Sequence, residues 1–198
     1  GCDNATVSLY IDDEFAGNMS FYADGLYTSD SIARGDAKYT LSAEVPGYKT
    51  ASASTVIPSP SALLEFTFNE FEGLDEEGFD YSSVVFTFQN EPFETRYYDS
   101  RVILMTSEGE FIRDPYIITD SVLINEGLPL NLFSNEIIKG IPEYTMKTDY
   151  YVSHHKFIFQ FRSVSEEYYH YVRQHYLYET GRFPEFGISS NAAFPLYS

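Results

Sequence analysis

The chain has 198 residues, of which 30 are acidic and 12 are basic, so its formal net charge at pH 7 is −18. This charge argues against nucleic acids and anionic lipid surfaces as partners, because both are themselves negatively charged. Hydrophobic residues make up 43% of the chain, which is typical of folded domains with apolar cores rather than of a disordered acidic segment.

The aromatic residues and the single cysteine further limit the class of protein to which the chain can belong. The chain has 18 tyrosines and 17 phenylalanines but no tryptophan, and Tyr and Phe favour the half-buried surfaces of β-sheets. Cys2 is the only cysteine, so no internal disulfide forms. No apolar run is long enough to span a bilayer.

The first 60 residues consist of short alternating runs separated by polar turns. Residues 5–11 (ATVSLYI) and 39–45 (YTLSAEV) alternate apolar and polar side chains, as half-buried strands do. The dipeptide Asp24-Gly25 is typical of a hairpin turn. Short strands at this spacing predict a β-sandwich of immunoglobulin-like or prealbumin-like type over residues 3–60.

A second β-rich domain is predicted after a stiff linker. The linker is residues 58–61 (PSPS), in which each proline restricts its own backbone and that of the residue before it. Residues 64–68 (LEFTF), 83–89 (SVVFTFQ) and 156–162 (KFIFQFR) alternate as strands do. We therefore expect the second domain to cover residues 61–198.

One helix is predicted, near residues 165–179, directly after the last strand. The sequence SVSE, which begins at Ser163, is a capping box. Tyr169, Val172 and Tyr176 recur at three- and four-residue spacing and form one aromatic face. The predicted fold class is thus mainly β, with a single α-helix near the C-terminus and an extended tail after it.

The order of short motifs along the chain is more informative than any one of them. The predicted helix begins with a serine, an acid and paired tyrosines (Ser165, Glu166, Tyr168 and Tyr169), and residues 183–186 (FPEF) follow it. The N-terminal half contains ATVSL at residues 5–9, GLY at residues 25–27 and PGY at residues 46–48. In this order the chain resembles the Bacteroidetes-type outer-membrane lipoprotein family called domain of unknown function 4249.

The resemblance implies a location and a class of partner but no reaction. Proteins of this family are exported, are tethered to the outer membrane by lipid, and are often associated with TonB-dependent outer-membrane receptors. We therefore expect a protein of the cell envelope with a possible TonB-dependent receptor as its partner. The sequence leaves the ligand and the oligomeric state open.

Cys2 is the candidate for lipid attachment. Gly1-Cys2 has the form of the end of a bacterial lipobox, in which the cysteine thiol receives the lipid. The alternative is an ordinary cysteine near the end of the chain, with no modification.

An acidic stretch is the candidate metal site. It is expected to form a loop over residues 69–80, and its oxygens would suit Ca²⁺, which takes six to eight oxygen ligands. The alternative is a solvated hairpin loop that binds no cofactor. The six carboxylates are Glu70, Glu72, Asp75, Glu76, Glu77 and Asp80.

Two serines are candidates for O-glycosylation. Ser31 and Ser121 each lie in an Asp-Ser-aliphatic sequence, a pattern used for this modification in exported proteins of bacteria of this type. The pattern is short and also arises by chance.

Tyr98, Tyr151 and Tyr171 are the candidates for an aromatic binding surface. Exposed aromatic rings are enriched at interaction sites and stack on sugars and peptides. The alternative is that the tyrosines of the helix pack it onto a sheet. In the pairs Tyr97-Tyr98 and Tyr150-Tyr151, one ring is expected to face inward and the other outward.

Catalytic motifs are absent from the sequence. It contains no G-x-S-x-G nucleophile elbow and no glycine-rich phosphate loop. We therefore expect a non-enzymatic protein that binds a ligand or a partner for an outer-membrane receptor. The alternative is a structural or adhesive surface protein that uses its sandwich as a stalk, and a hydrolase with paired carboxylates ranks third.

Overall fold

The computed structural model describes residues 4–151 and 156–180. The protein forms two compact units. One comprises Pro60–Tyr169. The other comprises the residues up to Ser59 and those from His170 onward, so the boundary after Tyr169 lies within the last helix. The described residues form antiparallel sheets and end in a helix, so the predicted mainly β fold with a C-terminal helix is confirmed.

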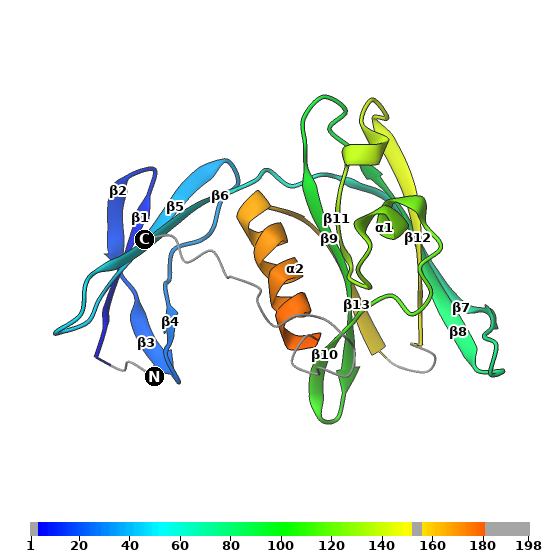
Figure 1. The fold of residues 1–198 in the computed structure, drawn as a ribbon, viewed down its shortest axis with the longest axis horizontal. Coiled ribbons are helices and arrows are strands. Elements are labelled where there is room, and N and C mark those ends of the chain that lie inside the picture. Colours follow the sequence, from blue (N-terminus) through cyan, green and yellow to red (C-terminus); the bar gives the residue numbers. More distant parts are fainter. Residues whose placement is uncertain (1–3, 152–155, 181–198) are drawn as a thin grey trace. The chain divides into compact units, whose positions relative to one another are not determined.

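The N-terminal unit, drawn in blue to cyan in Figure 1, contains a four-stranded antiparallel sheet and a two-stranded hairpin. The sheet has the order β2-β1-β5-β6, and β3 pairs with β4. The strands are β1 (Thr6–Ile11), β2 (Glu14–Asn18), β3 (Ser20–Ala23), β4 (Leu26–Thr28), β5 (Ala37–Glu44) and β6 (Ala51–Ile57).

Local sequence explains the turns and the core of this unit. Asp12 and Asp13 have φ angles of 52° and 67°, a left-handed conformation that aspartate tolerates and that a two-residue hairpin turn requires. Val7 and Leu9 are buried. The hydroxyl of Tyr27, on the hairpin, donates a hydrogen bond to the carbonyl of Ala5 at 3.3 Å and so joins the hairpin to the sheet.

The second unit is built from two antiparallel sheets. One has the order β12-β8-β7. In the other, β9 pairs with β13 along its whole length, and with β10 and β11 on its opposite edge. The strands are β7 (Leu63–Leu74), β8 (Asp80–Gln89), β9 (Tyr97–Thr106), β10 (Gly109–Arg113), β11 (Leu132–Ser134), β12 (Glu143–Tyr150) and β13 (Lys156–Val164).

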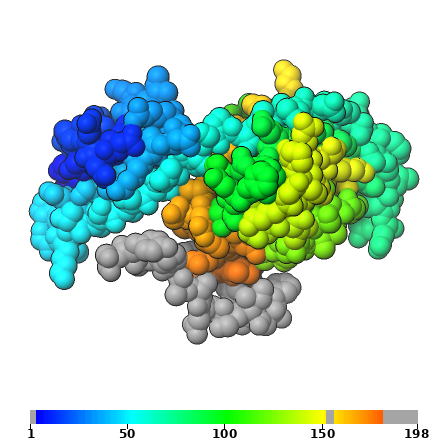
Figure 2. Space-filling view, turned by 90° about the horizontal axis from the view of Figure 1, so that it is seen from above, coloured from blue at the N-terminus to red at the C-terminus, as the bar shows by residue number. Residues whose placement is uncertain are grey.

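Aromatic side chains hold these two sheets face to face. Phe86 and Phe88 of β8 are fully buried. Their ring centroids lie 4.9 Å from Phe159 and 4.8 Å from Phe161 of β13, respectively. The atoms of this unit, coloured from blue-green to yellow, form one compact mass in the space-filling view (Figure 2).

The last helix, α2 (Glu166–Thr180), confirms the helix predicted near residues 165–179. The backbone N–H of Tyr168 donates to the hydroxyl of Ser165 at 3.2 Å, which caps the first turn. A second short helix, α1 (Ser121–Glu126), was not predicted. Asp120 caps its start and Gly127, with φ of 70°, ends it. A 3-10 turn also lies at Glu136–Ile138.

Phe86→Ala is expected to destabilise the second unit by about 3–5 kcal/mol, because it removes a fully buried ring from the sheet interface. The matched control is Phe93→Ala, since Phe93 is 89% exposed and its removal should change stability by less than about 0.5 kcal/mol. Urea unfolding followed by circular dichroism measures both changes. Equal losses in the two variants would contradict the assigned core.

Candidate functional site

The turn between β7 and β8 is organised by one carboxylate. Oδ1 of Asp75 accepts hydrogen bonds from the backbone N–H groups of Glu77 (2.9 Å) and Phe79 (2.8 Å). Gly78, with φ of 86°, supplies the left-handed residue that closes the turn. The turn is therefore short and ordered by its own side chain, as aspartate commonly does in turns.

The same carboxylate gathers tyrosines from different parts of the chain. Oδ2 of Asp75 accepts hydrogen bonds from the hydroxyl of Tyr116 at 2.9 Å and from the hydroxyl of Tyr151. The rings of Tyr116 and Tyr151 have centroids 4.0 Å apart, and Tyr81 of β8 meets Tyr116 edge to face at 6.0 Å. We call Tyr81, Tyr116 and Tyr151 the tyrosine cluster.

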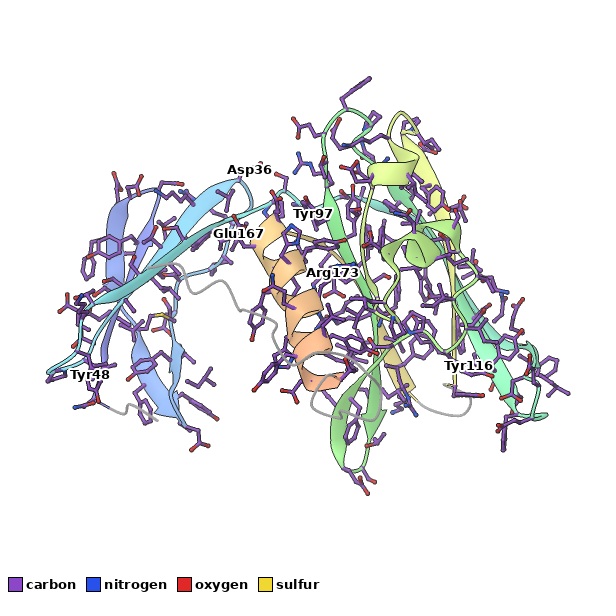
Figure 3. The ribbon with its side chains drawn as sticks, viewed as in Figure 1. Asp36, Tyr48, Tyr97, Tyr116, Glu167 and Arg173 are labelled. Carbon is purple, nitrogen blue, oxygen red and sulfur yellow. The ribbon has the colours of Figure 1, made fainter. Side chains whose placement is uncertain are left out.

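Backbone pairing fixes the position of the cluster. Tyr151 directly follows β12, and the N–H of Tyr116 donates to the carbonyl of Asp149 at 2.7 Å, which holds the segment after β10 against β12. Tyr116 and Phe79 remain exposed. Figure 3 shows Tyr116 beside the turn between β7 and β8.

Electrostatics in the cluster favour a charged Asp75 and neutral tyrosines. The hydrogen bond from Tyr151 lowers the pKa of Asp75 to about 2, and bonds from Phe79, Tyr116 and Glu77 act in the same direction. Partial burial, followed by the hydrogen bond to Asp75, raises the pKa of Tyr151. Both oxygens of the carboxylate are thus occupied by protein donors. Tyr116 is the exposed ring of the cluster, while Tyr81 and Tyr151 are half-buried.

Of the three tyrosines predicted to form a binding surface, only Tyr151 lies in this cluster. The prediction for Tyr98 was wrong, because its side chain is fully buried and stacks on Phe161 at 5.4 Å. The expected inward–outward alternation holds, but Tyr97 is the ring that faces away from this core and packs on Tyr169 at 4.7 Å. Tyr171 is exposed on α2 and contacts His175 rather than the cluster.

The expected acidic loop is largely strand. β7 continues to Leu74, so Glu70 and Glu72 belong to a strand, although its pairing with β8 is irregular between Asn69 and Gly73. Glu72 accepts from Lys147 Nζ at 2.6 Å and from the hydroxyl of Ser83 at 2.8 Å, and the bond from Lys147 is the main cause of its lowered pKa.

The six acidic residues of the candidate metal site therefore lie in different environments. Glu72 and Asp75 are each committed to protein donors, while Glu76, Glu77 and Asp80 are exposed. Within residues 4–151 and 156–180, no three metal-ligating side chains gather into a group that could hold an ion. Calcium binding stays an untested prediction.

The candidate modification sites lie in different settings. Ser31 is exposed in the segment between β4 and β5. Ser121 is exposed as the first residue of α1, where Asp120 of the same motif serves as the helix cap. Cys2 lies outside the described residues. Neither modification is tested by the structure.

A buried ion pair, not foreseen from the sequence, anchors the start of α2. Asp99 of β9 is buried and accepts from the guanidinium groups of Arg101 and Arg162. Both arginines also donate to the hydroxyl of Tyr168, at 3.0 and 3.2 Å. One carboxylate thus fixes two strands and the first turn of the helix.

Glu126 at the end of α1 makes a second connection to α2. Its carboxylate is buried and accepts from the backbone N–H and the hydroxyl of Ser134, at 2.6 and 3.0 Å. It also accepts from the hydroxyl of Tyr169 on α2. Tyr168 and Tyr169 therefore pack and bond the first turn of the helix within the second unit, which agrees with the alternative interpretation of the helix tyrosines.

Three aspartates have raised pKa values, and burial is the main cause in each. Asp114 accepts from the side-chain amide of Asn131 at 3.0 Å. Asp120 caps α1 through the N–H of Val122 at 2.8 Å. Asp149 lies 3.6 Å from Lys147 Nζ. Each carboxylate thus has a protein partner.

The described part of the chain contains no helix that is long and apolar enough to cross a membrane.

The architecture defines a mainly β protein of two units with a helix after its last strand and an organised tyrosine cluster on the second unit. A family model described as "Domain of unknown function (DUF4249)" matches residues 2–186, so the chain belongs to that family. This confirms membership of DUF4249, which the order of the sequence motifs indicated. The bacterial group and the lipid anchor stay predictions. No curated protein and no solved structure matches the chain.

Asp99→Asn is expected to cost about 3–5 kcal/mol of stability, because it leaves the arginines around it without their buried counter-charge. Glu94→Gln is the matched control, since Glu94 pairs with Arg96 at an exposed site and should cost at most about 1 kcal/mol. Chemical denaturation at neutral pH compares the two. A loss for Asp99→Asn no larger than that of the control would show that the pair does not anchor α2.

Asp75 should make stability depend on pH in the acid range. Its pKa in the folded protein, about 2, is below its ordinary value, so its contribution is complete above about pH 4 and is lost as the pH falls toward 2. Asp75→Asn should therefore be less stable than the wild type near neutral pH, and the two curves should converge in acid. Urea unfolding followed by tyrosine fluorescence measures this difference. Asp80→Asn is the control, and a difference independent of pH would refute the assignment.

Proposed function

We propose that the protein is a non-enzymatic binding protein of the cell envelope, tethered to the outer membrane by lipid on Cys2. In this proposal it is an accessory of a TonB-dependent outer-membrane receptor, and the tyrosine cluster contacts the ligand or the receptor. The proposal concerns the full-length protein in its own membrane.

The observation that carries the proposal is the arrangement of the tyrosine cluster. Three rings from β8, from the segment after β10 and from the end of β12 meet at one place, although they are far apart in sequence. Asp75 holds the hydroxyls of two of them, so the rings are ordered before any ligand arrives. Ordered aromatic rings at a surface bind at a low cost in side-chain entropy.

Family membership supports the proposed location in the cell envelope, but it does not indicate which ligand is bound. The family description names no function, and the proposed export, lipid anchor and receptor association rest on the resemblance described above. The sequence Gly1-Cys2 supports the anchor because it fits the end of a lipobox.

A structural or adhesive role is the second candidate, and the N-terminal unit favours it. β6 is the last strand of its sheet and is built largely of small uncharged residues (ASASTVI), most of them exposed. Flat edge strands without charged residues are suited to pairing with another chain. In this alternative the N-terminal unit is a stalk that assembles through its edge.

Tyr116→Ala is expected to reduce the recovery of a receptor or other partner when the tagged full-length protein is purified from membranes of its own host. The reason is that the substitution removes the exposed ring around which the cluster is built. Quantitative mass spectrometry of the purified material measures the partner relative to the protein. Tyr48→Ala is the matched control, because Tyr48 is a 79% exposed tyrosine on the other unit.

Three outcomes separate the alternatives. Stoichiometric recovery of a TonB-dependent receptor with the wild type, and a loss in Tyr116→Ala alone, would support the proposal. Equal recovery in both variants would show that the partner contacts a surface other than the tyrosine cluster. Recovery of no partner from a well-solubilised membrane would favour the structural or adhesive alternative.

A further inference from the structure

The interior of the second unit is open along one side. Phe66 of β7 pairs directly with Phe86 of β8, so both rings lie on the face of the sheet that is directed toward β13. Phe86 is fully buried, whereas Phe66 is 43% exposed. An interior-facing phenylalanine that remains this exposed indicates that no described residue covers it on the outer side.

Two strand edges border this opening. Within the described residues, β7 pairs only with β8, and β13 pairs only with β9. Where β7 and β13 approach each other, side chains make the contacts: ring centroids are 5.1 Å apart for Phe66 and Phe159 and 4.5 Å apart for Phe68 and Phe157. We call β7 residues 64–68 and β13 residues 157–161 the open seam.

Backbone groups along the open seam are available for pairing. Every other residue of an edge strand directs its N–H and C=O away from its own sheet. β13 pairs with β9 over Lys156 to Val164 without an irregularity, so its other edge is equally regular. The two sheets are therefore joined at this side by phenylalanine rings rather than by strand pairing.

We propose that the open seam binds an extended segment of a partner polypeptide, which adds as a strand to the edge of β7. Its apolar side chains would cover Phe66 and Phe159, and its alternate side chains would lie beside Glu65 on the opposite face. Strand addition of this kind takes affinity from backbone hydrogen bonds and specificity from alternate side chains. The partner segment thus alternates apolar and basic residues.

The register of β7 limits the length of this segment. β7 pairs regularly with β8 from Glu65 to Asn69, and irregularities lie on either side, between Leu63 and Glu65 and between Asn69 and Gly73. Irregularities of this type bend a strand and end its pairing surface. The regular stretch therefore accepts a segment of about five residues.

Charge favours a different, basic polypeptide over a second copy of this chain. Pairing of two β7 edges would bring together two strands that each carry Glu65, Glu70 and Glu72, on proteins of net charge −18. Like charges opposed across a strand pair are destabilising. A basic segment instead meets an exposed carboxylate at Glu65 and the attractive field of the whole protein.

This inference concerns a different surface from the tyrosine cluster and does not depend on the proposed function. Asp75, which organises that cluster, lies beyond the C-terminal end of β7, outside the regular stretch. The test uses purified full-length protein and synthetic peptides, so its failure would leave the receptor proposal untouched.

The test measures binding of a dye-labelled seven-residue peptide that alternates valine and lysine, by fluorescence anisotropy. The matched peptide has the same charge but carries proline in place of its central valine, which removes a backbone donor and prevents strand pairing. We expect the alternating peptide to bind at least about tenfold more tightly than the proline peptide. Hydrogen exchange should show new amide protection in residues 64–69.

Two variants locate the contact. Glu65→Lys should weaken binding of the valine–lysine peptide and strengthen binding of a valine–glutamate peptide, because it reverses the charge beside the added strand. Ile112→Lys is the matched control and should bind as the wild type does. Ile112 is 55% exposed on β10, at the opposite edge of the sheet that contains β13.

Each remaining outcome overturns the proposal. Equal binding of the two peptides would show that general charge attraction, rather than strand addition, explains the binding. New protection confined to β6 or β10 would place the contact elsewhere. A dimer that forms with increasing concentration and disappears in Leu64→Lys would make a second copy of the chain the occupant. No binding of the alternating peptide would also refute the proposal.

Discussion

The second unit depends on the alternation of side chains along β9, because this strand pairs with β10, β11 and β13 and packs through Tyr98 on Phe88 of β8. Tyr98 and Val102 point into the core, where Tyr98 stacks on Phe161 of β13. Asp99 and Arg101 alternate with these residues and point to the other face, where Asp99 binds the arginines that hold Tyr168 of α2. A shift of one residue in the pairing of β9 would therefore place a carboxylate in the core and a phenol in the ion pair.

The same alternation explains which parts of the fold could be predicted from the sequence. Strands with strict alternation and the capped helix α2 were found because their signals are local. The full length of β7 was not predicted, because the acidic residues after Asn69 favoured a loop. In the structure Glu72 lies in the strand and accepts a hydrogen bond from Lys147 of β12. α1 was missed because it is six residues long, and its stability comes from the cap at Asp120 rather than from a periodic face.

The tyrosine cluster could be predicted only in part, for a physical reason. Tyr151 was identified because adjacent tyrosines in a strand must face opposite ways. In the other pair the same rule does not say which ring points inward, and burial of Tyr98 rather than Tyr97 follows from its packing against Phe133 and Phe88. Tyr116 joins the cluster through a hydrogen bond to a residue 41 positions earlier, and no local pattern contains that contact.

The large negative charge of the chain affects what can pair with the open seam. An exposed edge with phenylalanines behind it is a hazard in most proteins, because two copies can pair through it. A net charge of −18 opposes that pairing through the repulsion of like charges, and the irregularities at both ends of the regular stretch of β7 shorten the surface on which two copies could align. Neither feature opposes a short basic strand. The acidity of the chain thus allows an apolar edge to stay uncovered, and it also determines which kind of segment that edge can accept.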